Sequence, residues 1–191
     1  MRLCEALSRE RLHAILARLP ERRVAVVGDL ALDAYWYADM TISVLSRETP
    51  LFPRPVVRES YAPGAGANVA QNLAALGVGQ VLALSVLGDE WRGELLQREL
   101  IQRGVRADRL VVSERRSTTT YIKLILMGHN SQQEDARVDF ENAHPLPEDL
   151  EDALIDVVAA ELPQLDAVLI ADQLDVNGII TERVRDELSR L

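Results

Sequence analysis

Four polar residues are placed where they could bind hydroxyl groups together. Asp29, Asp33, Asn68 and Asp172 each follow a predicted strand or open a predicted helix. The carboxyl ends of parallel strands meet at one edge of a sheet, where ligands commonly bind. Carboxylates and amides at that edge supply acceptors and donors in fixed directions, as the hydroxyls of a sugar require. Each aspartate alone is more often a turn or cap residue, but the four together weaken that interpretation.

Residues 63–68, Pro-Gly-Ala-Gly-Ala-Asn, lead straight into a predicted helix. Gly64 and Gly66 have no Cβ, so the backbone can approach a ligand closely, and the first N–H groups of the helix are free to bind a polar or anionic group. The dinucleotide fingerprint does not fit, because Val69 stands where it needs Gly or Ala, and the chain has no Walker A Gly-Lys-Ser/Thr. A tight turn before a packing helix is the alternative.

A second set of charged residues lies on a predicted strand. Arg137, Asp139 and Glu141 are spaced two residues apart, so their side chains share one face. The two carboxylates could form an acid–base pair. The other interpretation is a charged side of a hairpin, turned toward solvent or toward a ligand. The three histidines are widely scattered, so we expect no metal centre built on them.

The composition describes an acidic protein that can form one domain. The chain has 191 residues, 48% of them hydrophobic and only 4% aromatic, so aliphatic side chains must fill the core. Its formal charge of −9 argues against a nucleic-acid surface, which needs a concentrated basic face. Cys4 is the only cysteine, so no intrachain disulfide can form, and we expect a cytoplasmic protein. No apolar stretch is long enough for a membrane span.

The elements that must position these residues alternate between strands and helices. Uninterrupted apolar runs predict buried strands, and apolar residues at helical spacing predict amphipathic helices. The predicted strands are 24–27, 81–87 and 167–171, and the predicted helices are 8–19, one ending before Gly77, 89–103, 147–162 and 181–191. Residues 118–127 and 136–140 predict a hairpin. This order favours an α/β fold with a parallel sheet and right-handed crossovers.

Five stretches of the chain carry a resemblance to a known family. They are residues 24–33, Leu45-Ser-Arg-Glu-Thr-Pro50, the glycine segment through Asn72, Val86-Leu-Gly-Asp-Glu90 and residues 133–141. In this order the chain resembles the N-terminal part of a ribokinase-like, PfkB-type carbohydrate kinase, most closely the heptose-7-phosphate kinase branch. The resemblance implies that residues 1–191 form part of one such domain. It also implies a mostly parallel sheet flanked by helices, and a small β lid from about residues 35–62 and 116–141.

The resemblance also implies roles for particular residues. Asp33 corresponds to the carboxylate that binds sugar hydroxyls, and Gly64 with Asn68 to a glycine and asparagine sugar contact. Ala65 stands where a second glycine is usual. Asp172 falls at a Ser-Asp-Tyr position whose other two members are replaced here. The substrate-binding residues that we expect are Asp33, Gly64, Ala65, Asn68, Arg137, Glu141 and Asp172.

Two motifs of the family are absent from this chain. They are an Asn-x-x-Glu segment and an Asp-Thr-x-Gly-Ala-Gly-Asp loop, which hold magnesium, ATP phosphates and the catalytic aspartate. We therefore expect a chain that is truncated before the ATP-binding half and is inactive alone, because it lacks these groups. We also expect strand 167–171 to expose apolar side chains. ATP and Mg²⁺ would serve the complete enzyme.

The partners expected for this chain follow from the same resemblance. They are a sugar or sugar phosphate, and either a second copy bound through the lid or a complementary C-terminal half. Two other interpretations stay open. The chain could be a non-catalytic sugar-binding or regulatory module, or an ordinary open α/β domain whose glycines only make turns.

Overall fold

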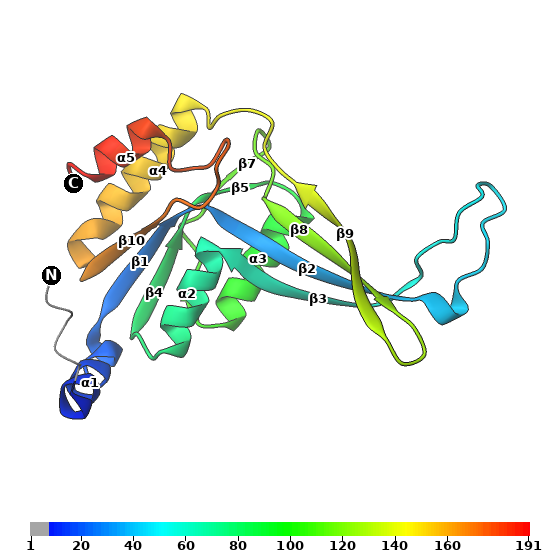
Figure 1. Ribbon diagram of the computed structural model, residues 1–191. Coiled ribbons are helices and arrows are strands. Elements are labelled where there is room, and N and C mark those ends of the chain that lie inside the picture. Colours follow the sequence, from blue (N-terminus) through cyan, green and yellow to red (C-terminus); the bar gives the residue numbers. More distant parts are fainter. Residues whose placement is uncertain (1–7) are drawn as a thin grey trace, which may run out of the picture.

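The computed structural model describes residues 8–191. Its core is a four-stranded parallel sheet in the order β10-β1-β4-β6. The strands are β1 (Arg23–Gly28), β4 (Gln80–Leu84), β6 (Val105–Arg106) and β10 (Ala167–Ala171). The apolar residues 24–27 of β1 are all buried, because β1 has a strand on each side and helices on both faces (Figure 1).

Two pairs of helices cover the two faces of this core sheet. One pair packs with Val24 and Val26, and the other packs with Ala25 and Val27, since alternate residues of a strand point to opposite faces. The first pair is α2 (Gly66–Ala75) and α3 (Trp91–Gln102), and the second is α4 (Glu148–Glu161) and α5 (Glu182–Leu188). The predicted fold class, a mostly parallel sheet flanked by helices, is confirmed.

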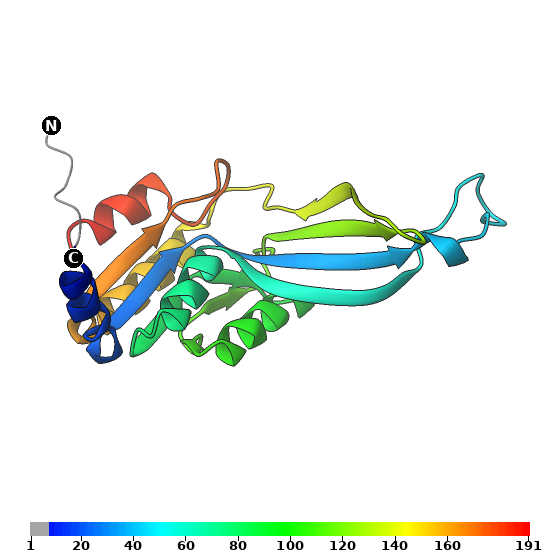
Figure 2. The same ribbon diagram turned by 60° about the horizontal axis from the view of Figure 1, so that its bottom comes forward.

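A second four-stranded sheet extends away from the core sheet, and we call it the projecting sheet (Figures 1 and 2). Its order is β3-β2-β8-β9, and only the β2–β8 pair is parallel. The strands are β2 (Leu30–Asp39), β3 (Val56–Ala65), β8 (Thr120–Met127) and β9 (Gln132–Phe140). The predicted hairpin is therefore present as β8 and β9, with β9 beginning earlier than expected. Residues 40–55 form the far end of the molecule in both views.

The predicted strand 81–87 is divided in two, which corrects the sequence interpretation. β4 ends at Leu84, and β5 (Val86–Gly88) pairs instead with β7 (Val111–Ser113) in a small separate sheet. The break lies at Ser85, a buried residue whose hydroxyl donates a hydrogen bond to the carbonyl of Gly28 (2.7 Å). An apolar run alone could not reveal the change of partner strand.

Strand β10 lies at an edge of the core sheet, with β1 as its neighbour. Leu169 and Ile170 are consequently 36% and 46% exposed, whereas the apolar run alone predicts burial. The exposure agrees with the apolar surface that we expect at this strand. Helix α1 (Arg9–Leu16), which precedes β1 in the chain, is shorter than the predicted helix 8–19, because Pro20 and its neighbours form a 3-10 turn.

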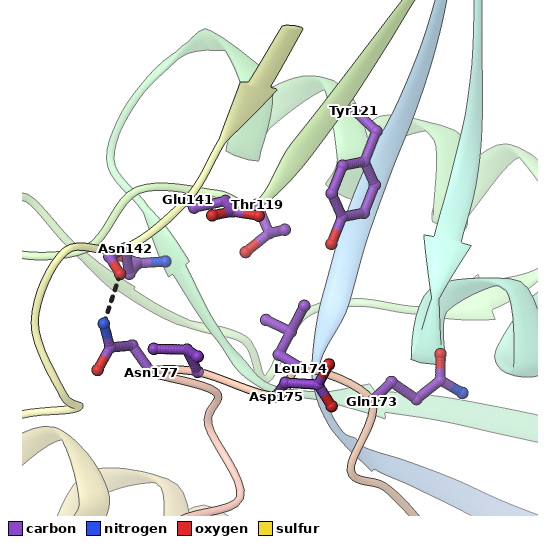
Figure 3. A pocket seen from close by; sticks show the side chains of 9 residues that line it. Thr119, Tyr121, Glu141, Asn142, Gln173, Leu174, Asp175 and Asn177 are labelled. Carbon is purple, nitrogen blue, oxygen red and sulfur yellow. Dashed lines mark hydrogen bonds between the residues drawn. The ribbon is translucent and has the colours of Figure 1, made fainter. Parts of the chain in front are cut away.

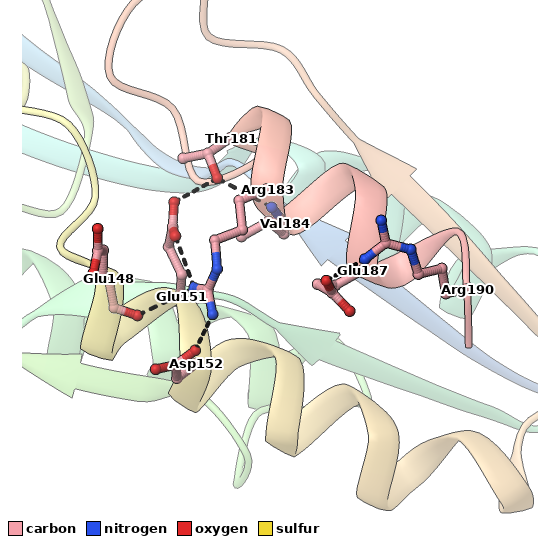
Figure 4. A network of polar contacts seen from close by, with 8 residues as sticks. All are labelled: Glu148, Glu151, Asp152, Thr181, Arg183, Val184, Glu187 and Arg190. Atoms are coloured by element: carbon pink, nitrogen blue, oxygen red, sulfur yellow. Dashed lines mark hydrogen bonds and ion pairs between the residues drawn. The ribbon is translucent and has the colours of Figure 1, made fainter.

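Helix α5 is fixed to α4 by polar contacts around the buried carboxylate of Glu151 (Figure 4). Glu151 accepts hydrogen bonds from the Thr181 hydroxyl (2.5 Å) and the Arg183 guanidinium (2.9 Å). Arg183 also pairs with Asp152. Thr181 caps α5 by accepting the N–H of Val184 (3.2 Å). These contacts anchor the far end of the loop that follows β10.

No helix within residues 8–191 has the length and apolar character needed to cross a membrane. The remaining short elements are 3-10 helices. The 3-10 helices are η1 (Leu19–Glu21), η2 (Met40–Ile42) and η3 (Leu162–Gln164).

Candidate functional site

Asp33 and the glycine segment meet where the projecting sheet joins the core. Asp33 lies in β2, and Gly64 lies near the end of the adjacent strand β3. A Cβ at Gly64 would lie only 3.1 Å from Asp33 Oδ2, so glycine leaves room for the carboxylate. Lys123 of β8 donates hydrogen bonds to Asp33 Oδ1 (3.2 Å) and to the Tyr35 hydroxyl (3.1 Å). Burial lowers the pKa of Lys123, but these two hydrogen bonds outweigh it and raise the pKa.

Tyr121 lies beside Asp33 on the same face of the projecting sheet. Strand register places Asp33, Tyr121 and Asp139 opposite one another in β2, β8 and β9. The Arg137 guanidinium lies 4.7 Å from the centre of the Tyr121 ring and donates two hydrogen bonds to Asp139 (2.7 and 2.6 Å). Burial raises the pKa of the Tyr121 hydroxyl, and the nearby carboxylate of Glu141 raises it further. This face is therefore polar and charged.

A pocket of about 280 Å³ lies between this face and the loop after β10 (Figure 3). The end of the projecting sheet contributes hydroxyl, carboxylate and amide groups. The loop contributes amide and carboxylate groups and two apolar side chains. The lining residues are Thr119, Tyr121, Glu141, Asn142, Gln173, Leu174, Asp175, Val176 and Asn177. Such a lining offers many hydrogen-bond donors and acceptors and more polar than apolar surface, which suits a polyhydroxyl ligand.

Asp29 holds the loop that forms one wall of this pocket. Its side chain is only 1% exposed, and it accepts three backbone N–H groups. Oδ2 accepts from Gln173 (2.8 Å) and Leu174 (3.0 Å), and Oδ1 accepts from Ile179 (2.7 Å). Both carboxylate oxygens are thus occupied by the backbone. The prediction that Asp29 joins the ring of hydroxyl-binding residues is wrong, because the loop folds over it.

Arg116 ties the same loop to the segment that follows β9. It is buried, and its guanidinium donates to the carbonyls of His144 (3.2 Å) and Asn177 (2.9 Å). The Asn177 side chain donates to the carbonyl of Asn142 (2.8 Å; Figure 3). The Asn142 amide in turn exchanges hydrogen bonds with the backbone of Ser117 (both 2.9 Å). These bonds fix two walls of the pocket relative to each other.

The mouth of α2 borders the same junction. The N–H of Gly66 donates to the carbonyl of Asp29 (2.8 Å), and a Cβ at Gly66 would lie 2.8 Å from the Cβ of Ala171. Ala65 has a φ of +47°, which is unusual for a residue with a side chain. Asn68 is exposed in the first turn of α2, and its Oδ1 accepts a hydrogen bond from Gln71 (2.7 Å).

The structure brings together some of the expected site residues and separates one. Asp33, Gly64, Arg137 and Glu141 lie around Tyr121, and Ala65 and Asn68 lie at the neighbouring helix mouth. Asp172 is exposed and pairs with Arg185 of α5 (2.5 Å), away from the lining of the pocket. The sequence interpretation missed Tyr121, Lys123, Gln173 and Asp175. For Tyr121 and Lys123 the only signal is strand register, which depends on knowing which strands are neighbours. Gln173 and Asp175 lie in a loop, and no local pattern places that loop.

No group of three His, Cys, Asp or Glu side chains in residues 8–191 is arranged to hold a metal ion. Cys4 lies outside this range.

The core sheet with helices on both faces and a second sheet at its strand ends defines a ribokinase-like fold. The structure is similar to phosphofructokinase-2 from Escherichia coli in complex with fructose-6-phosphate, with a TM-score of 0.60 and 20% identity over 88% of this chain and 51% of that chain. A possible 1-phosphofructokinase from Thermotoga maritima gives a TM-score of 0.59 and 21% identity, over 88% and 49%. At these identities the likeness shows the fold alone.

The sequence then shows the family. A sequence model of the pfkB family carbohydrate kinases matches residues 21–181, and the chain belongs to that family. It is 40% identical to the D-beta-D-heptose 7-phosphate kinase of Bordetella bronchiseptica over 158 residues, which are 81% of this chain and 46% of that protein. It is 35% identical to the bifunctional protein HldE of Hyphomonas neptunium over 184 residues, 95% of this chain and 35% of that one.

These matches confirm the predicted family and its nearness to the heptose-7-phosphate kinases. The chain spans less than half the length of both relatives.

Proposed function

We propose that this chain forms the sugar-binding part of a kinase that uses ATP to phosphorylate a hydroxyl group of a sugar or sugar phosphate in the cytoplasm. The observation that supports this most is the polar pocket lined by Tyr121 and Glu141. Asp33 lies opposite Tyr121 in the adjacent strand, and Gly64 lies beside Asp33. Membership of the pfkB carbohydrate kinases supports the same reaction.

Each expected site residue has a proposed part in binding. Asp33 would accept hydrogen bonds from sugar hydroxyls, because its carboxylate is half-exposed beside Gly64. Asn68 would present its amide at the mouth of α2, with Ala65 shaping the entrance. Glu141 would accept a hydrogen bond from a sugar hydroxyl at the pocket wall. Arg137 would orient Tyr121 through its contact with the ring. Asp172 would contact a ligand through Oδ1, because Arg185 engages Oδ2.

The projecting sheet would act as a lid over the sugar. Phosphoryl transfer depends mainly on positioning and charge stabilisation, so a lid that orders the acceptor hydroxyl and excludes water would serve it. The groups that bind ATP and Mg²⁺ would come from outside residues 8–191, either from a complementary C-terminal half or from the rest of a longer protein. A second copy could also bind through the projecting sheet.

Sugar binding is tested by calorimetry on wild-type chain with a panel of sugars and sugar phosphates. We expect Asn68→Ala to remove most of the binding, because the amide lies exposed at the helix mouth, while the thermal unfolding curve stays unchanged. Gln102→Ala is the control, since it removes an exposed amide at the last residue of α3, outside the pocket lining. Undiminished binding by Asn68→Ala would exclude its assignment to the site.

A non-catalytic sugar-binding module is the alternative function. The polar pocket supports it as well, because a lining of amides, hydroxyls and carboxylates can bind a sugar without any reaction. Both readings predict that the isolated chain releases no ADP from ATP above background, because loss of a general base alone typically costs 10²–10⁴-fold. A coupled ADP-release assay with each bound sugar checks this. Turnover clearly above an enzyme-free control would show that the chain carries its own phosphoryl-transfer groups.

A further inference from the structure

We infer that Arg92 is a positioning residue for the sugar pocket: it holds the base of the projecting sheet against α3 and so keeps one wall of the pocket in place. Arg92 does not itself line the pocket. The inference rests on the proposed function, because it assumes that a sugar binds there. It adds the contact through which the core of the molecule controls the shape of that site.

Arg92 lies in the first turn of α3 and contacts both segments that enter the base of the projecting sheet. Its guanidinium carbon lies 4.2 Å from the centre of the ring of Phe140, the last residue of β9, and at this distance the ring attracts a cation. The guanidinium also donates a hydrogen bond to the hydroxyl of Ser117 (3.3 Å), which precedes β8. The Arg92 side chain is only 13% exposed, so these contacts lie mostly out of water.

Glu90 completes this contact from the position just before α3. A residue at this position commonly uses its side chain to cap its own helix, but the Glu90 carboxylate makes no capping hydrogen bond to the described N–H groups of α3. Instead, Oε1 accepts the backbone N–H of Thr118 (3.0 Å), and Oε2 accepts Arg92 (2.8 Å). The carboxylate therefore holds Arg92 in its orientation and binds the segment before β8 as well.

The segment before β8 fits closely against the start of α3. Thr118 is 1% exposed, and its hydroxyl accepts the N–H of Gly88 (3.0 Å). A Cβ at Gly93 would lie only 2.9 Å from the same hydroxyl, so glycine permits this approach. The base of the projecting sheet is thus seated on α3 by backbone packing as well as by the side chain of Arg92.

The residues that Arg92 holds are the direct sequence neighbours of residues that line the pocket. Residues 117–118 come just before Thr119, and Phe140 comes just before Glu141; Thr119 and Glu141 both line the pocket. The opposite wall is the loop after β10. Loss of the Arg92 contacts would therefore let the first wall move relative to the core, and the hydrogen-bonding groups on the two walls would no longer be held at one spacing.

The first experiment measures the position of the projecting sheet and needs no ligand. Glu134→Cys in β9 and Asp186→Cys in α5 give exposed sites for two spin labels, and Cys4→Ser removes the natural thiol. Double electron–electron resonance then gives the distribution of distances between the labels. We expect Arg92→Ala to widen this distribution, because the base of the sheet loses its contact with α3.

The second experiment measures whether this movement reaches the pocket. Calorimetry uses the full chain with D-ribose, D-fructose 6-phosphate and a D-heptose 7-phosphate as probes. We expect Arg92→Ala to weaken the tightest of these interactions about tenfold, because the pocket is no longer preorganised. Arg92→Lys should give an intermediate affinity and an intermediate distance distribution, since it keeps the charge beside Glu90 but loses the planar group that stacks on Phe140.

Arg98→Ala is the matched control, because it removes an exposed arginine from the same helix. It should keep both the wild-type distances and the wild-type affinity, and equal losses in Arg98→Ala and Arg92→Ala would overturn the inference. If Arg92→Ala does not fold, Arg92→Lys gives the same comparison.

The remaining outcomes separate the inference from the proposed function. If wild type binds a probe and Arg92→Ala keeps either the wild-type affinity or the wild-type distances, the positioning role is overturned while sugar binding stands. If wild type binds none of the probes, the proposed sugar site is wrong, and the inference falls with it.

Discussion

At the scale of single residues, the carboxylate of Asp29 contributes most clearly to the order of the site. It accepts three N–H groups from a loop that has no regular secondary structure of its own. We expect Asp29→Asn to lower the free energy of unfolding by about 1–3 kcal/mol, because the amide nitrogen cannot accept the N–H groups that the second carboxylate oxygen accepts. Urea denaturation followed by circular dichroism measures the change.

The control for this prediction is Asp172→Asn, which alters an exposed carboxylate in the same loop. An exposed substitution of this kind should change stability by less than about 0.5 kcal/mol. Equal effects of the two variants would contradict the role that we give to the buried hydrogen bonds of Asp29.

The expected site residues were predictable only in part. The family resemblance gave Asp33 and Gly64 their expected roles, and the structure places the two side by side in β2 and β3. Tyr121 and Gln173 become site residues only through tertiary placement, which no local pattern contains. Asp29 shows the reverse error, since a carboxylate after a strand can bind the protein's own backbone as well as a ligand.

At the scale of elements, the junction between β3 and α2 is strained at Ala65. Its φ of +47° is a conformation that glycine adopts without cost and alanine does not. We expect Ala65→Gly to raise the free energy of unfolding by up to about 1 kcal/mol, because relief of strain outweighs the greater freedom of the unfolded chain. Thermal and urea unfolding both measure it.

Ala75→Gly, at the last residue of α2, serves as the matched control. There the backbone is helical, so glycine should destabilise by about 0.5–1 kcal/mol. If both substitutions destabilise the protein, the strain at Ala65 does not limit stability.

The elements themselves were predicted well where periodicity is strong and poorly where partner strands matter. β1 and the helices on both faces of the core sheet follow from apolar patterns, since burial on both faces requires an uninterrupted run in β1. The break at Ser85 and the edge position of β10 depend on which strands pair, and pairing is a long-range property. β2 begins five residues before the extended region that the sequence predicts, because it follows β1 after Asp29 alone.

At the scale of the whole molecule, several aspartates make the fold sensitive to acid. The pKa of Asp166 is lowered by the backbone N–H of Arg23 and by the Arg22 guanidinium, which link the start of β1 to the segment before β10. The pKa values of Asp39, Asp108, Asp135 and Asp149 are lowered too. A lowered pKa in the folded state stabilises the fold above the ordinary carboxyl pKa, and this stability is lost as the pH falls through the lowered value.

We therefore expect a urea midpoint that is nearly constant from neutral pH to about 5 and falls below about 4, the ordinary range of aspartate. Because these side chains are largely exposed, the effect of each should be modest and should shrink in high salt. Asp166→Asn should reduce the steepness of the fall. A midpoint that rises on acidification would contradict this account.

The two sheets are joined where two crossings of the chain lie side by side, and the hydrogen bond between these crossings bears on how the sheets could move relative to each other. The chain leaves β1 through Asp29 and returns from β3 directly into α2 at Gly66, and these two crossings are bonded to each other by the Gly66 N–H and the Asp29 carbonyl (2.8 Å). They form one pivot. β2 and β3 are ten residues long, so at about 3.3 Å per residue they make a lever arm of about 33 Å. A rotation of about 10° at the pivot would sweep the tip of that arm through about 6 Å. It would also widen or narrow the polar pocket, because one wall of the pocket belongs to the projecting sheet and the other to the loop after β10.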